Sequence, residues 1–184
     1  MKKFFITGAA GFIGSHVCEH ILSKFPNSKI IALDKLTYAG NKTFLKKIIN
    51  NKNFTFVKCD ILDAKKYVKY LKKIDCAINI AAESHVDNSF TNSIEFTKTN
   101  TLGAHIFLEN CIKNKVKKII HISTDEVYGD KLIGKSYEND SLNPTNPYSA
   151  SKAAAEMITS SYKYVFKKDI VIIRANNIYG TRQF

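Results

Sequence analysis

The clearest structural pattern in this chain is the segment Phe4-Phe5-Ile6-Thr7-Gly8-Ala9-Ala10-Gly11-Phe12-Ile13-Gly14. Its first three residues form a short apolar run, which predicts a buried strand. Three glycines follow with the spacing Gly-x-x-Gly-x-x-Gly. Apolar residues then recur every four positions as far as Phe25, which predicts one face of a helix that ends before Pro26. A strand, a glycine turn and a helix in this order are typical of a unit that binds a dinucleotide.

The three glycines have separate physical roles in such a unit. Gly8 permits a tight turn, Gly11 lets the backbone approach a pyrophosphate, and Gly14 lets the helix pack closely on the strand. The amino terminus of the helix attracts the phosphate charge. A plain turn between a strand and a helix could also use three glycines, so the next part of the chain has to decide between the two interpretations.

A carboxylate stands where a dinucleotide-binding unit needs one. Asp34 ends the next predicted strand, Lys29 to Leu33, and lies 20 residues beyond Gly14. At this spacing a carboxylate meets the ribose hydroxyls of an adenine dinucleotide. The sequence therefore predicts NAD as the cofactor, because Asp34 would repel the 2′-phosphate of NADP. Lys35, next to it, weakens this preference a little.

The alternation of strands and helices continues along the chain. Apolar runs predict further strands at residues 54–57, 76–80, 119–122 and 170–174. Helices are predicted at 63–73, at 93–114 and from Tyr148 onward, with a polar loop at 130–147. This pattern predicts an α/β fold with a doubly wound parallel sheet, the Rossmann architecture, in one domain over residues 1–184.

Two pairs of residues at the ends of predicted strands are further candidates for cofactor contacts. Asp60 and Ile61 could contact the adenine, one by hydrogen bonding and the other by packing. Alternatively, Asp60 caps the next helix, and the sequence leaves both interpretations open. Ala81 and Ala82 are small, which would leave room for a cofactor to cross the edge of the sheet.

A set of groups that can transfer protons follows the strand predicted at 119–122. The stretch Ser123-Thr124-Asp125-Glu126 places two carboxylic acids beside two hydroxyls, and Tyr148 comes 22 residues after Glu126. Tyr148 and Lys152 share a face of a helix, and a nearby ammonium group lowers the pKa of a tyrosine from about 10 toward the range of a useful base. As alternatives, the two acids form only a polar turn, or the Tyr-x-x-x-Lys pair arises by chance.

The net charge of +12 is compatible with binding to nucleic acid. Against this, the basic residues are 26 Lys and only two Arg, spread along most of the chain, whereas recognition of bases and phosphates favours Arg. We therefore expect a solvated lysine surface and no nucleic-acid partner.

Membrane and metal sites are not expected either. No apolar run approaches the roughly 20 residues that a membrane helix needs, and the first residues meet glycines too early for a signal peptide. The sequence thus predicts a cytoplasmic location and no membrane partner. The four cysteines form no Cys-x-x-Cys pair, so neither a zinc site nor a disulfide framework is expected.

With these motifs in place, the chain resembles the extended short-chain dehydrogenase/reductase family, and more narrowly the nucleotide-sugar 4,6-dehydratases. The resemblance covers essentially the whole chain. The segments that carry it are Thr7 to Ser15, Asp34 to Asn41, Ala81 to Asp87, Ser123 to Gly129 and Pro144 to Lys152. The third and fourth are the specific ones, because related epimerases do not normally have an Asp-Glu pair after the Ser/Thr.

The resemblance implies a redox-neutral mechanism. Tyr148 takes the proton of a hexose 4-hydroxyl while hydride passes from C4 to NAD, Thr124 holds the oxygen, and Lys152 tunes Tyr148 and binds the nicotinamide ribose. Glu126 then removes the C5 proton as a base, and Asp125 protonates the departing 6-hydroxyl as an acid. Hydride returns to C6 and gives a 4-keto-6-deoxy sugar.

The resemblance also implies the remaining site residues and the assembly. Ser84, His85 and Asn177, together with Thr124, are expected to bind substrate, and a homodimer is expected to pair through two helices, at 93–114 and 148–166. No metal is needed by the family's chemistry. The expected cofactor-binding residues are Gly8, Gly11, Phe12, Ile13, Gly14, Asp34, Lys35, Asp60, Ile61, Ala81, Ala82, Asn100, Tyr148 and Lys152. For Asn100 the alternative is an ordinary position on a helix surface.

The nucleotide and the extent of the enzyme stay open in the sequence. Segments such as Asp34 to Asn41 resemble dTDP-glucose enzymes, whereas Asn176 to Gly180 resembles UDP-glucose enzymes; we favour dTDP-glucose. The family continues with a smaller substrate-binding domain, which we expect to be missing here. The alternatives are an epimerase or reductase of the same superfamily and a non-catalytic fragment that binds NAD.

Overall fold

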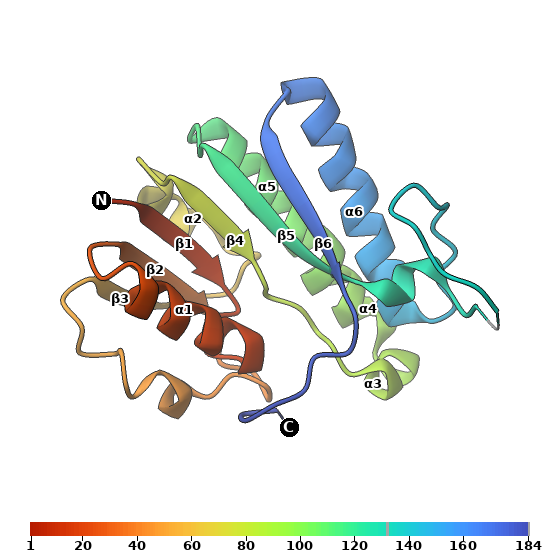
Figure 1. The fold of residues 1–184 in the computed structure, drawn as a ribbon, viewed down its shortest axis with the longest axis horizontal. Helices are drawn as coiled ribbons and strands as arrows, with labels where there is room; N and C mark the ends of the chain where they lie inside the picture. The colour runs from red at the N-terminus through yellow and green to blue at the C-terminus, as the bar shows by residue number, and fades with distance from the viewer. Residues whose placement is uncertain (132, 184) are drawn as a thin grey trace.

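The computed structural model describes residues 1–131 and 133–183; Leu132, within the predicted loop at 130–147, and Phe184 lie outside the described residues. The described chain forms one parallel sheet of six strands in the order β3-β2-β1-β4-β5-β6 (Figure 1). The strands are β1 (Lys3–Thr7), β2 (Lys29–Asp34), β3 (Phe54–Lys58), β4 (Cys76–Asn79), β5 (Lys118–Thr124) and β6 (Asp169–Ala175). The predicted strands and the doubly wound α/β class are confirmed.

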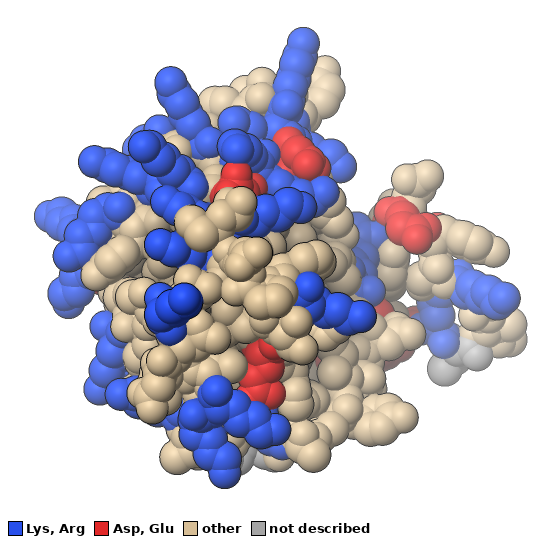
Figure 2. All heavy atoms as spheres, turned by 60° about the vertical axis from the view of Figure 1, so that its left-hand side comes forward, with Lys and Arg blue, Asp and Glu red and all other residues tan. Residues whose placement is uncertain are grey.

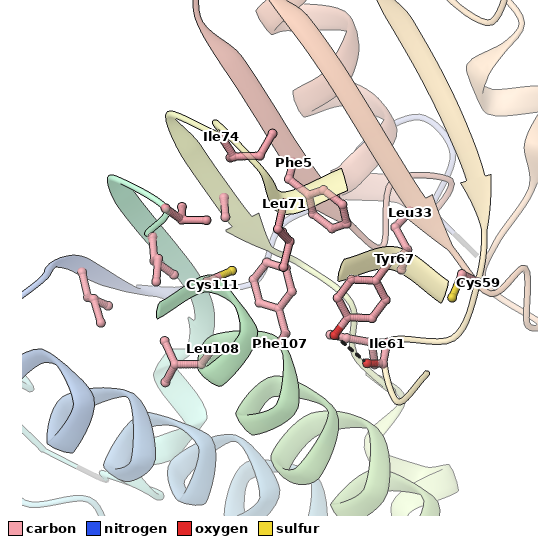
Figure 3. Packing of buried hydrophobic residues seen from close by; sticks show 14 residues of the cluster. Phe5, Leu33, Cys59, Ile61, Tyr67, Leu71, Ile74, Phe107, Leu108 and Cys111 are labelled. Atoms are coloured by element: carbon pink, nitrogen blue, oxygen red, sulfur yellow. Dashed lines mark hydrogen bonds between the residues drawn. The ribbon is translucent and has the colours of Figure 1, made fainter. Parts of the chain in front are cut away.

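Helices cover both faces of this sheet. Helix α1 (Phe12–Lys24) lies on one face, and α5 (Ala104–Lys113) and α6 (Pro147–Phe166) lie on the other (Figure 1). Each face has its own apolar core. On the α5 side Phe5, Tyr67 and Phe107 pack with ring centroids 5.8–6.5 Å apart (Figure 3). Strands buried on both faces explain why the sequence shows apolar runs rather than alternation.

The topology determines where a ligand can bind. The strand order reverses between β1 and β4, since β1 continues to β2 and β3 on one side and β4 continues to β5 and β6 on the other. In open α/β sheets the crevice outside the carboxyl ends of the strands at this switch point is the ligand site. The glycine turn follows β1, at that crevice.

The prediction of a single regular helix at 63–73 is wrong. The segment forms a short helix α2 (Ala64–Tyr67) and then a 3₁₀ turn η2 (Val68–Leu71). Tyr67 and Leu71 are fully buried, and the Tyr67 hydroxyl donates a 3.0 Å hydrogen bond to the carbonyl of Ile61 (Figure 3). These tertiary anchors outweigh the helix propensity of the lysine-rich sequence.

The helical region predicted at 93–114 is also interrupted. It consists of α4 (Ser93–Phe96), a π-helical segment η3 (Thr97–Gly103) and α5, and a further helix α3 (Val86–Thr91), which was not predicted, precedes it. A Cβ on Gly103 would lie 2.6 Å from Cγ2 of Ile61, so η3 packs directly on a residue of the predicted cofactor site. Single π turns are frequent at functional sites.

Lysine side chains dominate part of the surface. Figure 2 shows the side of the molecule on which β3 lies, with many Lys and Arg side chains and a few carboxylates among them. Lysines such as Lys46, Lys47 and Lys52 are exposed, which agrees with the solvated surface that the sequence predicts. The exclusion of a nucleic-acid partner stays a prediction. Over residues 1–131 and 133–183, no helix is both long enough and apolar enough to cross a bilayer.

Candidate active site

A cavity of about 380 Å³ opens at the carboxyl ends of the strands. Loops that follow all six strands contribute to its wall, together with the first turns of α1 and α6. Most of the predicted site residues line it: Gly8, Gly11, Phe12, Ile13, Gly14, Asp34, Lys35, Asp60, Ile61, Ala81, Ala82, Ser84, His85, Thr124, Glu126, Tyr148, Lys152 and Asn177. Asn100 and Asp125 are the two predicted residues that do not line it.

The glycine turn is shaped by close backbone contacts. Gly8 has φ +66°, and a Cβ there would lie 2.7 Å from the backbone nitrogen of Ala81. A Cβ on Gly14 would clash with the carbonyl oxygen of Gly8 and lie 2.8 Å from Cα of Ala9. Both positions therefore require glycine, and the turn can pack directly on the loop after β4 and on the start of α1.

Asp34 holds the turn in place from β2. Its Oδ2 accepts a 2.8 Å hydrogen bond from the backbone N–H of Ala10, and its Oδ1 accepts one of 2.7 Å from Leu36. Burial raises the pKa of this carboxyl above its ordinary value, although the hydrogen bonds from the backbone oppose the shift. A carboxylate at the end of β2 thus connects the glycine turn to the loop that follows β2.

Asp60 pairs with Lys35 across the cavity rim. The Lys35 Nζ lies 2.7 Å from Asp60 Oδ2, and Asp60 Oδ1 accepts a 2.9 Å hydrogen bond from the backbone N–H of Leu62. Burial alone would raise the pKa of Asp60, but these two partners outweigh it and the pKa lies below its ordinary value. The N-cap of α2 is Asp63, so the structure does not support the alternative in which Asp60 caps that helix.

The predicted proton-transfer groups come from three elements. Thr124 ends β5, Glu126 lies in the 3₁₀ turn η4 (Asp125–Tyr128), and Tyr148 and Lys152 lie on α6. The Lys152 Nζ donates a 2.6 Å hydrogen bond to the carbonyl of Ile122. These groups face one cavity with the glycine turn.

The expectation that Lys152 lowers the pKa of Tyr148 is not met in this geometry. Burial raises the pKa of Tyr148 to about 12, against a lowering contribution from its hydrogen bond with Thr124. Burial lowers the pKa of Lys152 to about 8, against the opposing charge of Glu156. The sequence spacing correctly predicts that Tyr148 and Lys152 share a helix face, but the cost of burying the charged form of each group dominates the pKa shifts of both.

The N-terminus of α6 holds Glu126. Asn146 is the N-cap of α6 and forms a capping box with Ser149, and its Nδ2 donates a 3.0 Å hydrogen bond to Glu126 Oε2. Asp125 instead accepts a 3.3 Å hydrogen bond from the Thr124 hydroxyl. The two neighbouring acids therefore have different partners, which is the condition under which two carboxyl groups can divide acid and base roles.

Residues 5–184, which include this site, match the family described as GDP-mannose 4,6 dehydratase. The chain belongs to this family. It is 49% identical to a dTDP-D-glucose 4,6-dehydratase of Dictyostelium discoideum, over 100% of this chain and 45% of that protein. It is 45% identical to the trifunctional UDP-glucose 4,6-dehydratase RHM3 of Arabidopsis thaliana, over 100% of this chain and 28% of that protein.

Solved structures agree with the family. The structure of DesIV, a dTDP-glucose 4,6-dehydratase from Streptomyces venezuelae with NAD and TYD bound, superposes with a TM-score of 0.95 at 38% identity. The match covers 98% of this chain and 57% of that one. The chain thus spans about half the length, or less, of the relatives that it matches.

Asn100, which the family resemblance singled out, is buried and not on a helix surface. Its Oδ1 accepts a 2.8 Å hydrogen bond from the N–H of Glu83, and its Nδ2 donates to the carbonyl of Glu83 and to Ser151 Oγ, both at 2.9 Å. Asn100 therefore joins η3, the loop after β4 and α6 behind the cavity wall.

Several lining residues were missed in the sequence. Thr37, Gly40, Thr99 and Gln183 line the cavity. Gly40 carried a usable signal, because it belongs to the segment that carries the family resemblance; a Cβ there would lie 2.7 Å from Asp34 Oδ1. Thr99 reaches the cavity because of the π segment, and Gln183 because the chain returns toward the cavity after β6. No local sequence pattern predicts either position.

A buried polar row lies beneath the site. Thr7 Oγ1 donates a 2.6 Å hydrogen bond to Asn79 Oδ1, and Asn79 Nδ2 lies 3.2 Å from His121 Nδ1. Nε2 of His121 and Oγ of Ser123 are buried without a hydrogen-bond partner in the described part of the chain. Burial lowers the pKa of His121 to about 3.

No group of three His, Cys, Asp or Glu in the described residues could hold a metal ion.

Proposed function

We propose that the chain carries the cofactor-binding and catalytic part of an NAD-dependent nucleoside-diphosphate-glucose 4,6-dehydratase, with dTDP-glucose as the favoured substrate and UDP-glucose as the alternative. One observation carries the proposal: Glu126, from the Asp-Glu pair, shares a cavity with Thr124, Tyr148, Lys152 and the glycine turn. The membership in the dehydratase family and the 49% identical dTDP-D-glucose relative support it.

The residues of the cavity fit NAD. The glycine turn and the amino terminus of α1 offer backbone N–H groups to a pyrophosphate, and Gly11 leaves the approach open because it has no side chain. Asp34 and the Lys35–Asp60 pair lie at the adenosine end. NAD, when bound, supplies the acceptor and donor of hydride. The co-bound NAD of the DesIV structure supports this assignment.

Tyr148 receives the first proton in the proposed reaction. Its deprotonated side-chain oxygen accepts the proton of the sugar 4-hydroxyl, and Thr124, which hydrogen-bonds with Tyr148, holds the same sugar oxygen. Lys152 lies one helical turn further along the same face of α6 and is proposed to bind the nicotinamide ribose. Ser84, His85 and Asn177 line the cavity and are proposed to contact the sugar nucleotide.

The acid pair carries the dehydration. Once C4 is a ketone, Glu126 removes the acidified C5 proton as a base. Asn146, which donates a hydrogen bond to Glu126 Oε2, fixes the Glu126 carboxylate. Asp125 supplies the proton with which the 6-hydroxyl leaves as water, and Glu126 gives its proton back to C5 when hydride returns to C6. Asp125 does not line the cavity, and its bond to Thr124 keeps it next to the reacting groups.

The test is to incubate the chain with NAD and either dTDP-glucose or UDP-glucose and to look by mass spectrometry for loss of one water. The nucleotide that gives product identifies the substrate. An epimerase or reductase gives no water loss, and a cofactor-binding fragment binds NAD without turnover. A Glu126→Gln variant separates the first alternative further, since an epimerase keeps its activity while a dehydratase stalls after oxidation.

We also propose a homodimer in the cytoplasm. Apolar side chains stand exposed on the two helical regions expected to pair, among them Leu102 at 49% and Met157 at 68% exposure. All four cysteines are free thiols, which suits a reducing compartment. Size-exclusion chromatography with light scattering tests the dimer: Met157→Glu should give a monomer, whereas Ile133→Glu, at an exposed apolar residue outside both helical regions, should not.

A further inference from the structure

The proposed acid pair is tied to α6 by an ion pair that lies outside the cavity wall. Arg174, on β6, donates from Nε to both carboxylate oxygens of Glu156 at 3.2 and 2.9 Å, and its NH2 group lies 2.8 Å from Glu156 Oε2. The Glu156 side chain is only 2% exposed. Neither residue lines the cavity.

The same arginine reaches the turn that carries Asp125 and Glu126. Its NH1 group donates a 2.7 Å hydrogen bond to the Tyr128 hydroxyl, and its guanidinium carbon lies 4.7 Å from the centre of the Tyr128 ring. NH1 also donates a 3.0 Å hydrogen bond to the carbonyl of Glu138. One side chain therefore joins β6, α6, the η4 turn and the loop that follows this turn.

Glu156 lies one helical turn after Lys152 on the same face of α6. We infer that Arg174 and Glu156 are positioning residues that hold the η4 turn and Lys152 against each other; the inference rests on the proposed dehydratase function. Arg174 fixes the turn through Tyr128, and the carboxylate of Glu156 supplies the negative charge that Lys152 faces inside the protein.

The charges around Lys152 make this arrangement testable. Burial lowers the pKa of Lys152 to about 8, and Glu156 opposes that shift. The titratable and charged groups on the elements packed around Lys152 include His121 on β5, Tyr148 and Glu156 on α6, Arg174 on β6, and Asp125, Glu126 and Tyr128 on η4. Of these, Glu156 and Arg174 carry opposite charges outside the cavity, so replacing them should move the Lys152 titration in opposite directions.

The experiment is an NMR titration of the protein labelled with ¹³Cε-lysine, in which a Lys152→Met spectrum assigns the Lys152 signal. Wild type should titrate near pH 8. Glu156→Gln should lower that midpoint by about one pH unit, and Arg174→Gln should raise it. Glu109→Gln, which breaks an exposed pair with Lys113, is the matched control and should leave it unchanged. Circular dichroism checks that each variant is folded.

The outcomes separate the inference from the proposed function. Equal midpoints in wild type and Glu156→Gln, or shifts of both variants in one direction, would overturn the inference even if wild type shows turnover. Should wild type show none, the proposed function fails while the titration still decides the role of Glu156. Where turnover is present, Tyr128→Phe should lower kcat roughly tenfold with KM within about twofold, and Tyr137→Phe should change neither. Unchanged kcat in Tyr128→Phe would refute the positioning role of Arg174 through Tyr128.

Discussion

At the scale of single residues, the ion pair between Lys35 and Asp60 sets the charge at the end of the cavity that is proposed to hold the adenosine. Lys35 is adjacent to Asp34, but its amino group lies 2.7 Å from the Asp60 carboxylate, which neutralises it. We predict that Asp60→Asn frees Lys35 and raises the affinity for NADP roughly tenfold, because an ammonium group can then bind the 2′-phosphate. Calorimetric titration with NADP and NAD measures this. As the control, Asp63→Asn breaks the ion pair with Lys66, which lies outside the cavity, and it should change the affinity for neither NAD nor NADP. Unchanged NADP binding in Asp60→Asn would contradict the role proposed for the pair between Lys35 and Asp60.

Also at this scale, His121 should make the protein sensitive to acid. Its pKa is about 3 in the fold against 6.5 in the unfolded chain, so the stability it contributes is complete above pH 6.5 and is lost as the pH falls toward 3. His121→Asn keeps an acceptor for Asn79 and removes the titration. Between pH 6.5 and 4 the variant should lose less stability than wild type, by up to ~1.4 kcal/mol for each pH unit, in urea unfolding series. Parallel losses in the two proteins would show that His121 is not the responsible group.

At the scale of elements, two glycines in the turn between β1 and α1 have different roles, Gly14 in folding and Gly11 in cofactor binding. Gly14→Ala places a methyl group against the backbone of Gly8 and Ala9, so we predict a loss of several kcal/mol and a poorly folded protein. A Cβ on Gly11 meets nothing closer than 3.4 Å and adds to the cavity wall. Gly11→Ala should therefore keep the thermal midpoint of wild type and lose NAD affinity. Equal effects of the two substitutions on stability would refute this division of roles.

The elements also show where reasoning from the sequence succeeds. Strands, the glycine turn and the first helix follow from local periodicity, and all were predicted. The π segment η3, the break after α2 and the separate paths of Asp125 and Glu126 depend on packing against Ile61, on buried Tyr67 and on Asn146. These contacts join residues that lie far from their partners in the chain or depend on the packed core, and no local pattern encodes them.

At the scale of the whole molecule, the end of the described chain fastens the two halves of the sheet together. After β6 the chain returns to α1, where the Arg182 NH2 group donates to both oxygens of Glu19 at 2.8 and 2.9 Å and NH1 donates to Ser15 at 2.9 Å. The backbone of Arg182 has φ 73°, a strained value for a residue other than glycine. We predict that Arg182→Ala lowers the unfolding free energy by about 1–2 kcal/mol, because the bidentate pair is largely buried. Lys98→Ala, at an exposed pair with Glu95, should change it by less than about 0.5 kcal/mol in the same urea series. A loss as small as that of the control would contradict the fastening role.

Whether this chain carries dehydratase chemistry is best measured by comparing wild type with Glu126→Gln in the presence of NAD and each nucleotide sugar. Wild type should form a product lighter by one water with one of the two sugars. The variant should bind NAD with unchanged affinity, since Glu126 lies in η4 and not in the glycine turn, and it should release no water. Water loss that persists in Glu126→Gln, or NAD binding by wild type with no product from either sugar, would contradict the claim that this chain carries the chemistry of a dehydratase.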